Sequence, residues 1–120
     1  MKQLYKDLLT SKYTKVEVDE NFTFNAPHHY VVKKANADAT GDVLLDIHFQ
    51  EGPILQCGVN GVCNEDLINM VIDRLEHFQN SEFRCRENAL AITALEEALL
   101  WLRKRTMGRE QRGVEGTHIV

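Results

Sequence analysis

Residues 89–102 read ALAITALEEALLWL, and this stretch indicates a long helix in the second half of the chain. Almost every position in it is apolar or a strong helix former. A helix that packs on one sheet shows a single apolar stripe, whereas the apolar residues here are too many for one narrow stripe. We therefore expect a helix from Arg86 or Glu87 to about Met107 that contacts both its own sheet and a second copy of the chain.

Cations follow this apolar run in close succession. They are Arg103, Lys104, Arg105, Arg109 and Arg112. Positive charge at the end of a helix complements the helix dipole, so capping and a solvated face explain part of the cluster. Residues 84–112 nevertheless hold seven cations against four acids, in a chain whose net charge is −4. Arg105 and Arg109 are four residues apart and share a face, and guanidinium groups match the geometry of phosphate. The cluster therefore predicts a site for a small phosphorylated anion.

A shorter helix is predicted at about residues 64–78, where Asn64 suits an N-cap and acidic residues fill the first turn. Four apolar residues then recur on one face: Leu67, Val71, Leu75 and Phe78. Phe78 ends this face, so it is either a core residue or a ring on which a base could stack. Asn88, at the start of the long helix, is either a capping residue or an amide that reads a base edge or a ribose hydroxyl.

The first half of the chain alternates apolar and polar residues, as half-buried strands do. One strand is expected between Tyr13 and Phe24, where Thr14–Val18 and Phe22–Phe24 alternate. Others are expected at His29–Lys34, at Val43–Phe49 and, after a turn, at Ile54–Cys57 as a short fourth strand. Short connections without helices between these segments favour an antiparallel meander. Residues 1–13 carry a weak helical pattern, and residues 35–42 form a polar loop.

The fold class that follows is α+β: an N-terminal antiparallel β-sheet followed by two α-helices, the second one long. The 120 residues are expected to form a single domain. Its parts are the sheet at about 14–57, a helical hairpin at about 64–107 and an extended tail at 108–120. Because the long helix is apolar on several sides, an intertwined homo-oligomer is expected.

Several classes of protein are disfavoured. No apolar run reaches the roughly 20 residues of a membrane helix, and the N-terminus lacks the features of a signal peptide. A cytoplasmic location without membrane contact is therefore expected. The acidic balance argues against DNA or RNA polymers as partners. The odd number of cysteines, at Cys57, Cys63 and Cys85, indicates reduced, partly buried thiols. These cysteines lack zinc spacing and no catalytic motif is present, so no metal, cofactor or catalytic residue is expected.

Six segments of the sequence together resemble a known family. They are FQxGPI at 49–54, GVNG at 58–61, NEDL at 64–67, RLxxFQ at 74–79, RENALA at 86–91, and the stretch from Arg105-Thr106 to RGVEGT at 112–117. These segments are similar to those of the phage Thoeris anti-defence sponge proteins. The resemblance covers about residues 43–117, and residues 1–40 take no part in it.

This resemblance implies a protein that sequesters cyclic ADP-ribose isomers of the glycocyclic type, which bacterial TIR enzymes make as immune signals, without cleaving them. It also implies dimers and hexamers, action in the host cytoplasm, and in some members cyclic oligonucleotides at a separate site. The resemblance assigns base stacking and amide contacts to Phe78 and Asn88, phosphate binding to Arg105 and Arg109, and closure of the pocket from a partner subunit to Arg112, Glu115 and Thr117.

Two other functions stay open at this point. One is a hydrolase of the same signal or of another nucleotide. The other is a small phage protein that inhibits a host enzyme by direct contact through its apolar helix. Recovery of intact ligand separates binding from hydrolysis, and a host protein that co-purifies at fixed stoichiometry would favour direct inhibition.

Overall fold

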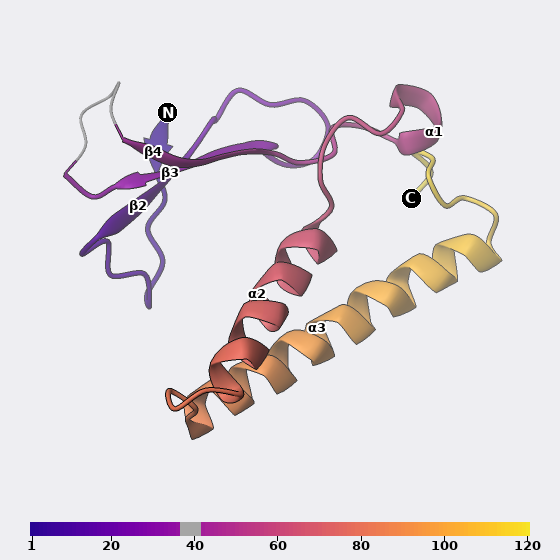
Figure 1. Cartoon of the computed structure of the whole chain (residues 1–120). Helices are drawn as coiled ribbons and strands as arrows, with labels where there is room; N and C mark the ends of the chain where they lie inside the picture. The colour runs from indigo at the N-terminus through magenta and orange to yellow at the C-terminus, as the bar shows by residue number, and fades with distance from the viewer. Residues whose placement is uncertain (37–41) are drawn as a thin grey trace. The chain divides into compact units, whose positions relative to one another are not determined.

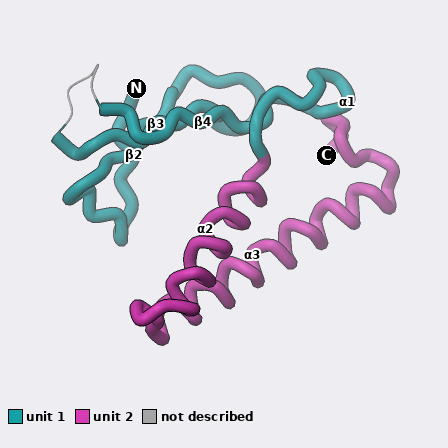
Figure 2. The backbone as a smooth tube through the Cα atoms, viewed as in Figure 1, with its two compact units in different colours: residues 1–62 teal, residues 63–120 magenta. Residues whose placement is uncertain are grey.

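The computed structural model describes residues 1–36 and 42–120, with an antiparallel sheet in the first half of the chain and helices in the second (Figure 1). The chain forms two compact units, residues 1–62 and residues 63–120 (Figure 2). The first unit contains the sheet, and the second contains the two long helices and the tail. The predicted α+β class, a sheet followed by two helices of which the second is long, is confirmed.

The sheet has four strands that follow one another in sequence order, and every neighbouring pair is antiparallel. The strands are β1 (Lys2–Gln3), β2 (Thr14–Val18), β3 (His29–Lys34) and β4 (Val43–His48). Val16 lies opposite Val32 and Val18 lies opposite Tyr30, so β-branched and aromatic side chains meet across the strands. The alternation that predicted β2, β3 and β4 therefore reflects real pairing. The predicted loop at 35–42 lies partly outside the described residues.

Three helices follow the sheet: α1 (Ile54–Cys57), α2 (Asn64–Gln79) and α3 (Arg86–Gln111). Cys63 caps α2 in a capping box, in which the carboxylate of Asp66 accepts the backbone N–H of Cys63 at 2.8 Å. Cys85 caps α3, and its Sγ accepts the backbone N–H of Asn88 at 3.5 Å. The two long helices contact each other, and α3 continues beyond the start of α2 (Figure 1).

Three predictions for the first unit are wrong. Residues 1–13 contain β1 and turns rather than a helix. Residues 22–24 form no strand, since Phe24 adopts a left-handed backbone with φ of 63° that no ladder accommodates. Residues 54–57 form α1 instead of a fourth returning strand, so the sheet ends at His48 and not near residue 57.

Side-chain amides explain why residues 49–62 form a loop instead of a hairpin. Gln50 Nε2 donates to the carbonyls of Gly52 and Gly58, and Gln50 Oε1 accepts the N–H of Asn60. The amide of Asn60 in turn pairs with the N–H and carbonyl of Glu51, both at 2.8 Å. Side chains thus satisfy the backbone groups that a strand ladder would have used. Gly52 has φ of 84°, and a Cβ there would lie 2.7 Å from Cys57 Sγ, so glycine is required.

The predictions for the second unit need smaller corrections. Asn64 is the first residue of α2 rather than its N-cap, which is Cys63. The helix α3 ends at Gln111 and not near Met107, and it contains Gly108. Arg103 and Glu110, which lie two helical turns apart on either side of that glycine, form an ion pair with 2.9 Å between Nη1 and Oε1. This pair joins the last turns of the helix. The tail therefore starts at residue 112 and makes turns instead of being extended.

Few apolar side chains are buried in the described part of the chain. The buried ones are Val18, Val31 and Ile72, and no described side chain is fully buried. On α3, Leu100 is 71% exposed and Trp101 is 61% exposed. The three cysteines are free and exposed, not partly buried as predicted. A chain of 120 residues normally hides more apolar surface than this, so these side chains are available to a partner.

Lys33 and Glu17 form a largely buried pair of charges on the neighbouring strands β3 and β2. Lys33 Nζ lies 2.7 Å from Glu17 Oε1, and their side chains are only 9% and 15% exposed. The hydrogen bond from Lys33 lowers the pKa of Glu17 below its ordinary value of 4.5, against a smaller opposing effect of burial. The pair therefore ties the two strands together most strongly when the carboxylate is ionised.

Replacing Glu17 with glutamine is expected to lower the free energy of unfolding by roughly 1.5–3 kcal/mol at pH 7, the range for a hydrogen bond to a charged group. Because the pKa of Glu17 is lower in the folded chain, this stabilisation is present above about pH 4.5 and is lost as the pH falls through the lowered value. Thermal melts followed by circular dichroism should show the two proteins converging at low pH. Glu20→Gln removes only an exposed pair with Lys2 and should change little at any pH. A constant gap down to pH 3 would contradict the assignment.

Candidate ligand-binding site

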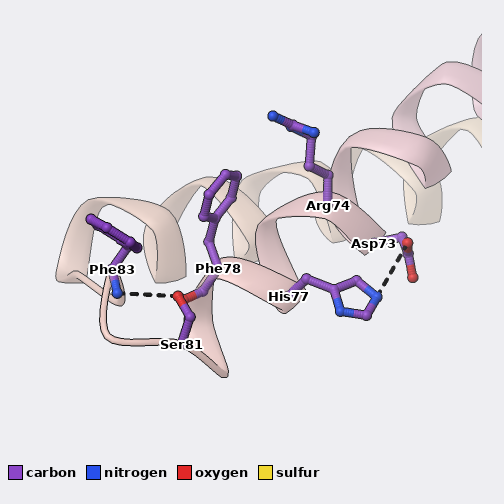
Figure 3. Close-up of a pocket in the computed structure, with 6 residues that line it drawn as sticks. All are labelled: Asp73, Arg74, His77, Phe78, Ser81 and Phe83. Atoms are coloured by element: carbon purple, nitrogen blue, oxygen red, sulfur yellow. Dashed lines mark hydrogen bonds and ion pairs between the residues drawn. The ribbon is translucent and has the colours of Figure 1, made fainter.

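A pocket of about 500 Å³ lies at the C-terminal end of α2. Its lining consists of Asp73, Arg74, His77, Phe78, Ser81 and Phe83 (Figure 3). Arg74 and Phe78 are one helical turn apart and project from the same side of α2 (Figure 3). The guanidinium carbon of Arg74 lies 5.2 Å from the centroid of the Phe78 ring, within the range of a cation–π contact. The ring of Phe78 is 37% exposed, so it is not a core side chain.

The turn after α2 holds this aromatic wall in place. Ser81 Oγ donates to the carbonyl of Phe78 at 2.6 Å and accepts the N–H of Phe83 at 3.1 Å. The backbone of Phe83 is thereby held, and the largely exposed Phe83 ring also lines the pocket (Figure 3). Two aromatic rings and a guanidinium are suitable partners for a flat heterocycle with nearby negative charge.

Asn88 lies in the first turn of α3, outside the lining of this pocket. Its backbone N–H is held by the Sγ of Cys85. The cap of α3 is therefore Cys85, and the half-buried amide side chain of Asn88 does not serve as the cap. Sequence reasoning offered capping as the alternative role for Asn88, and the structure gives that role to Cys85.

Arg105 and Arg109 lie near the opposite end of α3 and differ in environment. Arg105 is exposed. Arg109 is half-buried, and its Nη2 donates to the carbonyls of Val114 and Thr117, each at 3.1 Å. Arg109 thus holds the tail of its own chain, which the sequence did not indicate.

The tail folds back through a series of turns. Gly113 and Gly116 have φ of 72° and 77°, values that favour glycine. Thr117 Oγ1 donates to the carbonyl of Val114 at 2.6 Å, and Arg112 Nη1 donates to the carbonyl of Val120 at 2.9 Å. Arg112 and Thr117 therefore stabilise the tail, while the side chain of Glu115 is exposed.

The sequence-predicted site residues therefore form two groups in this chain. Phe78 and Asn88 lie where α2 ends and α3 begins, whereas Arg105, Arg109 and the tail lie at the end of α3. Between Asn88 and Arg105 the helix rises by about 25 Å, at about 1.5 Å per residue. A single nucleotide-sized ligand does not bridge that distance within one chain.

Arg74, which lines the pocket beside Phe78, was not singled out from the sequence. The signal was present, because Arg74 and Phe78 have i, i+4 spacing on a helix that was placed correctly. A single cation one turn from an aromatic residue is a weaker signal than the dense run of cations after residue 102. Phe83 was missed because it follows the helix and has no periodic neighbours.

Comparison with known proteins places this geometry in context. Residues 41–107 match the family model described as "Acb2/Tad1, hairpin domain". The chain is also 50% identical to "Thoeris anti-defense 1" of Bacillus phage SBSphiJ7 over an alignment of 140 positions, gaps included, which covers 98% of this chain and 99% of that protein. The chain belongs to the phage Thoeris anti-defence family. The matched hairpin domain begins just before β4 and contains α2 and most of α3, so the Phe78 pocket lies inside it.

In residues 1–36 and 42–120, no group of three or more His, Cys, Asp and Glu side chains is placed to hold a metal ion. No helix in the same residues is long and apolar enough to cross a membrane.

Replacing Arg109 with alanine is expected to loosen the tail of this family member, since the carbonyls of Val114 and Thr117 both lose the charged donor that ties them to α3. Amide hydrogen exchange of residues 113–119 should accelerate at least about tenfold, the equivalent of about 1.4 kcal/mol, because hydrogen bonds to charged groups contribute roughly 1.5–3 kcal/mol. Arg105→Ala is the matched control, because Arg105 is exposed and one turn away. Equal exchange in the two variants would show that Arg109 does not hold the tail.

Proposed function

We propose that this protein binds and sequesters cyclic ADP-ribose-type immune signals, glycocyclic ADP-ribose in particular, in the cytoplasm of the host cell and without cleaving them. The observation that carries this proposal is the pocket in which Arg74 stacks on the half-exposed ring of Phe78. A ring and a guanidinium at that spacing favour a planar base with negative charge nearby. Membership of the Thoeris anti-defence family supports the same kind of ligand.

The remaining groups of the signal fit the second group of residues. The diphosphate of the ligand would contact Arg105, whose exposed guanidinium is free to pair bidentately with phosphate oxygens. Arg109 and Arg112 would contribute positive charge while they hold the tail. Asn88 would read a base edge or ribose hydroxyl, and Glu115 and Thr117 would close over the ligand.

Both groups reach one ligand only if a second copy supplies one of them, because about 25 Å of helix separates them within a chain. The exposed apolar side chains of α3 support such self-association, since Leu100 and Trp101 would otherwise face water. We therefore propose a homo-oligomer, at least a dimer and in its full form a hexamer. Native mass spectrometry and light scattering at micromolar concentration measure this directly. A clean monomer would contradict any pocket shared between copies.

Binding is favoured over hydrolysis by the surroundings of the titratable groups in the pocket. Asp73 and His77 form a surface ion pair with 3.7 Å between Oδ2 and Nε2, and their side chains are 75% and 80% exposed (Figure 3). A general base usually lies in a site sheltered from water, whereas both of these side chains are largely exposed. Sequestration requires tight binding instead of turnover. A nanomolar dissociation constant corresponds to about 12 kcal/mol of binding free energy.

The test of this function is the fate of the captured ligand. Glycocyclic ADP-ribose is mixed with the protein, the unbound fraction is measured after filtration, and the protein is then boiled. A sequestering protein removes the signal in a fixed ratio to its sites and returns it chemically unchanged. Ring-opened product exceeding one equivalent per site would instead establish a hydrolase. Failure to bind any cyclic nucleotide, together with a host protein that co-purifies at fixed stoichiometry, would establish direct inhibition of a host enzyme.

A further inference from the structure

Gln79, the last residue of α2, bridges the gap between the two long helices. Its Nε2 donates to the carbonyl of Cys85 at 2.9 Å, and its Oε1 accepts the N–H of Cys85 at 3.0 Å. One side-chain amide therefore pairs with both backbone groups of a residue at the start of α3. We propose that Gln79 is a positioning residue that fixes the stacking ring of Phe78 relative to the amide of Asn88. This inference rests on the proposed ligand site.

The connection on each side of Gln79 is short. Phe78 directly precedes Gln79 in the chain, so the same stretch of backbone carries the Phe78 ring and the side-chain amide of Gln79. On the other side, the Sγ of Cys85 accepts the N–H of Asn88. The residue that carries the stacking ring, Phe78, is thus linked to the backbone of Asn88 through three groups: the Gln79 side chain, the Cys85 backbone and the Cys85 thiol. This link does not depend on the loop between the helices.

The loop itself makes such a bridge necessary. Residues 80–85 separate the helices, and Cys85 is exposed, so its backbone N–H would otherwise bond to water. Ser81 holds the first part of this loop by hydrogen bonds to the backbone of Phe78 and Phe83. Gln79 instead joins the two ends of the loop, since it bonds from the end of α2 to Cys85. A ligand that contacts both helix ends binds more tightly when that spacing is set before it arrives, because less conformational entropy is lost on binding.

The chemistry of the bridge requires an amide. A donor and an acceptor on one planar group are both needed, and glutamine supplies them at this length. In Gln79→Glu, a carboxylate oxygen would face the Cys85 carbonyl oxygen across a contact that is now 2.9 Å. In Gln79→Met, the length of the side chain is kept and both hydrogen bonds are lost. We expect both variants to lose the bridge.

Calorimetric titration with glycocyclic ADP-ribose, together with hydrogen exchange on the free protein, tests this role. Gln79→Met and Gln79→Glu should each bind at least about tenfold more weakly, because the spacing of Phe78 and Asn88 is then no longer fixed before the ligand arrives. The Cys85 amide should exchange faster in the ligand-free variants. Gln111→Met replaces an exposed glutamine at the end of α3 and should leave both measurements unchanged.

A double-mutant cycle separates positioning from a general loss of stability. If Gln79 acts by placing Asn88, the effects of Gln79→Met and Asn88→Ala on affinity should be non-additive, while those of Gln79→Met and Arg105→Ala should add. Additivity with Asn88→Ala, or unchanged affinity in either Gln79 variant, would overturn the inference. If Gln79→Met does not fold, Gln79→Glu takes its place in the cycle. A wild-type protein that binds no cyclic ADP-ribose would refute the proposed function instead, and the exchange rate of the Cys85 amide would still report whether the bridge exists.

Discussion

Replacing Phe78 with alanine is expected to weaken the capture of glycocyclic ADP-ribose by roughly 5- to 150-fold. Stacking of a base on an aromatic side chain contributes about 1–3 kcal/mol, and each 1.4 kcal/mol is a factor of ten in affinity. The substitution also deprives Arg74 of the ring beneath its guanidinium, so the loss should fall in the upper part of this range. Calorimetric titration of the purified protein measures the change.

Two further substitutions make this result specific to the ring. Phe78→Leu keeps an apolar side chain of similar bulk without a π face, and it should lose most of the affinity that alanine loses. Tyr13→Ala removes an exposed aromatic residue from the sheet unit and should bind like the unaltered protein. Full affinity in both Phe78 variants would show that the base does not stack at this position.

The helices were predictable from sequence because their signals are local. The acidic first turn of α2 and the dense helix formers of α3 placed both helices within a few residues, and Glu65 and Asp66 lie in the first turn as expected. The alternation of apolar and polar residues likewise located β2, β3 and β4. In these segments the local preferences and the final packing agree, which is why a pattern along the chain was sufficient.

The loop at 49–62 shows where such patterns fail. The run of apolar residues before Cys57 has the composition of a strand, but the amides of Gln50 and Asn60 bind the backbone on both sides of it. Those contacts link residues eight to ten positions apart, and no periodicity encodes them. The bonds from Arg109 to the carbonyls of Val114 and Thr117 were missed for a related reason, because they join residues five and eight positions apart without a periodic signal.

The candidate site was predictable only in part, because a sequence lists site residues without saying which chain supplies them. Phe78 was expected to be either core or ligand-facing, and the exposure of its ring and the pocket beside it remove the core alternative. Arg105 was expected to serve the same ligand, yet it lies most of the length of α3 away from the start of that helix. The residues can belong to one site only through the symmetry of an assembly.

Mixing two inactive variants is therefore expected to restore binding. Phe78→Ala removes the stacking ring, and Arg105→Ala removes a phosphate contact that should contribute roughly 1.5–3 kcal/mol. If each site takes Phe78 from one copy and Arg105 from another, a mixed dimer has one site with both residues and one site with neither. Random exchange makes about half of the dimers mixed, so the tight-binding capacity should return to about a quarter of the unaltered level.

The measurement is ligand capacity after the two variants are unfolded together and refolded, at a ligand concentration too low for either variant alone to bind. Refolding each variant separately and then mixing them on ice provides the control, because little exchange of subunits should occur and capacity should stay near zero. The double variant, refolded with an equal amount of unaltered protein, should lower the capacity to about a quarter of the unaltered level, below the half that dilution alone leaves, because neither site of a mixed dimer is then complete. If co-refolding restores nothing although mixed oligomers are present by native mass spectrometry, then Phe78 and Arg105 do not complete one site between two copies, and the arginine must act elsewhere on the protein.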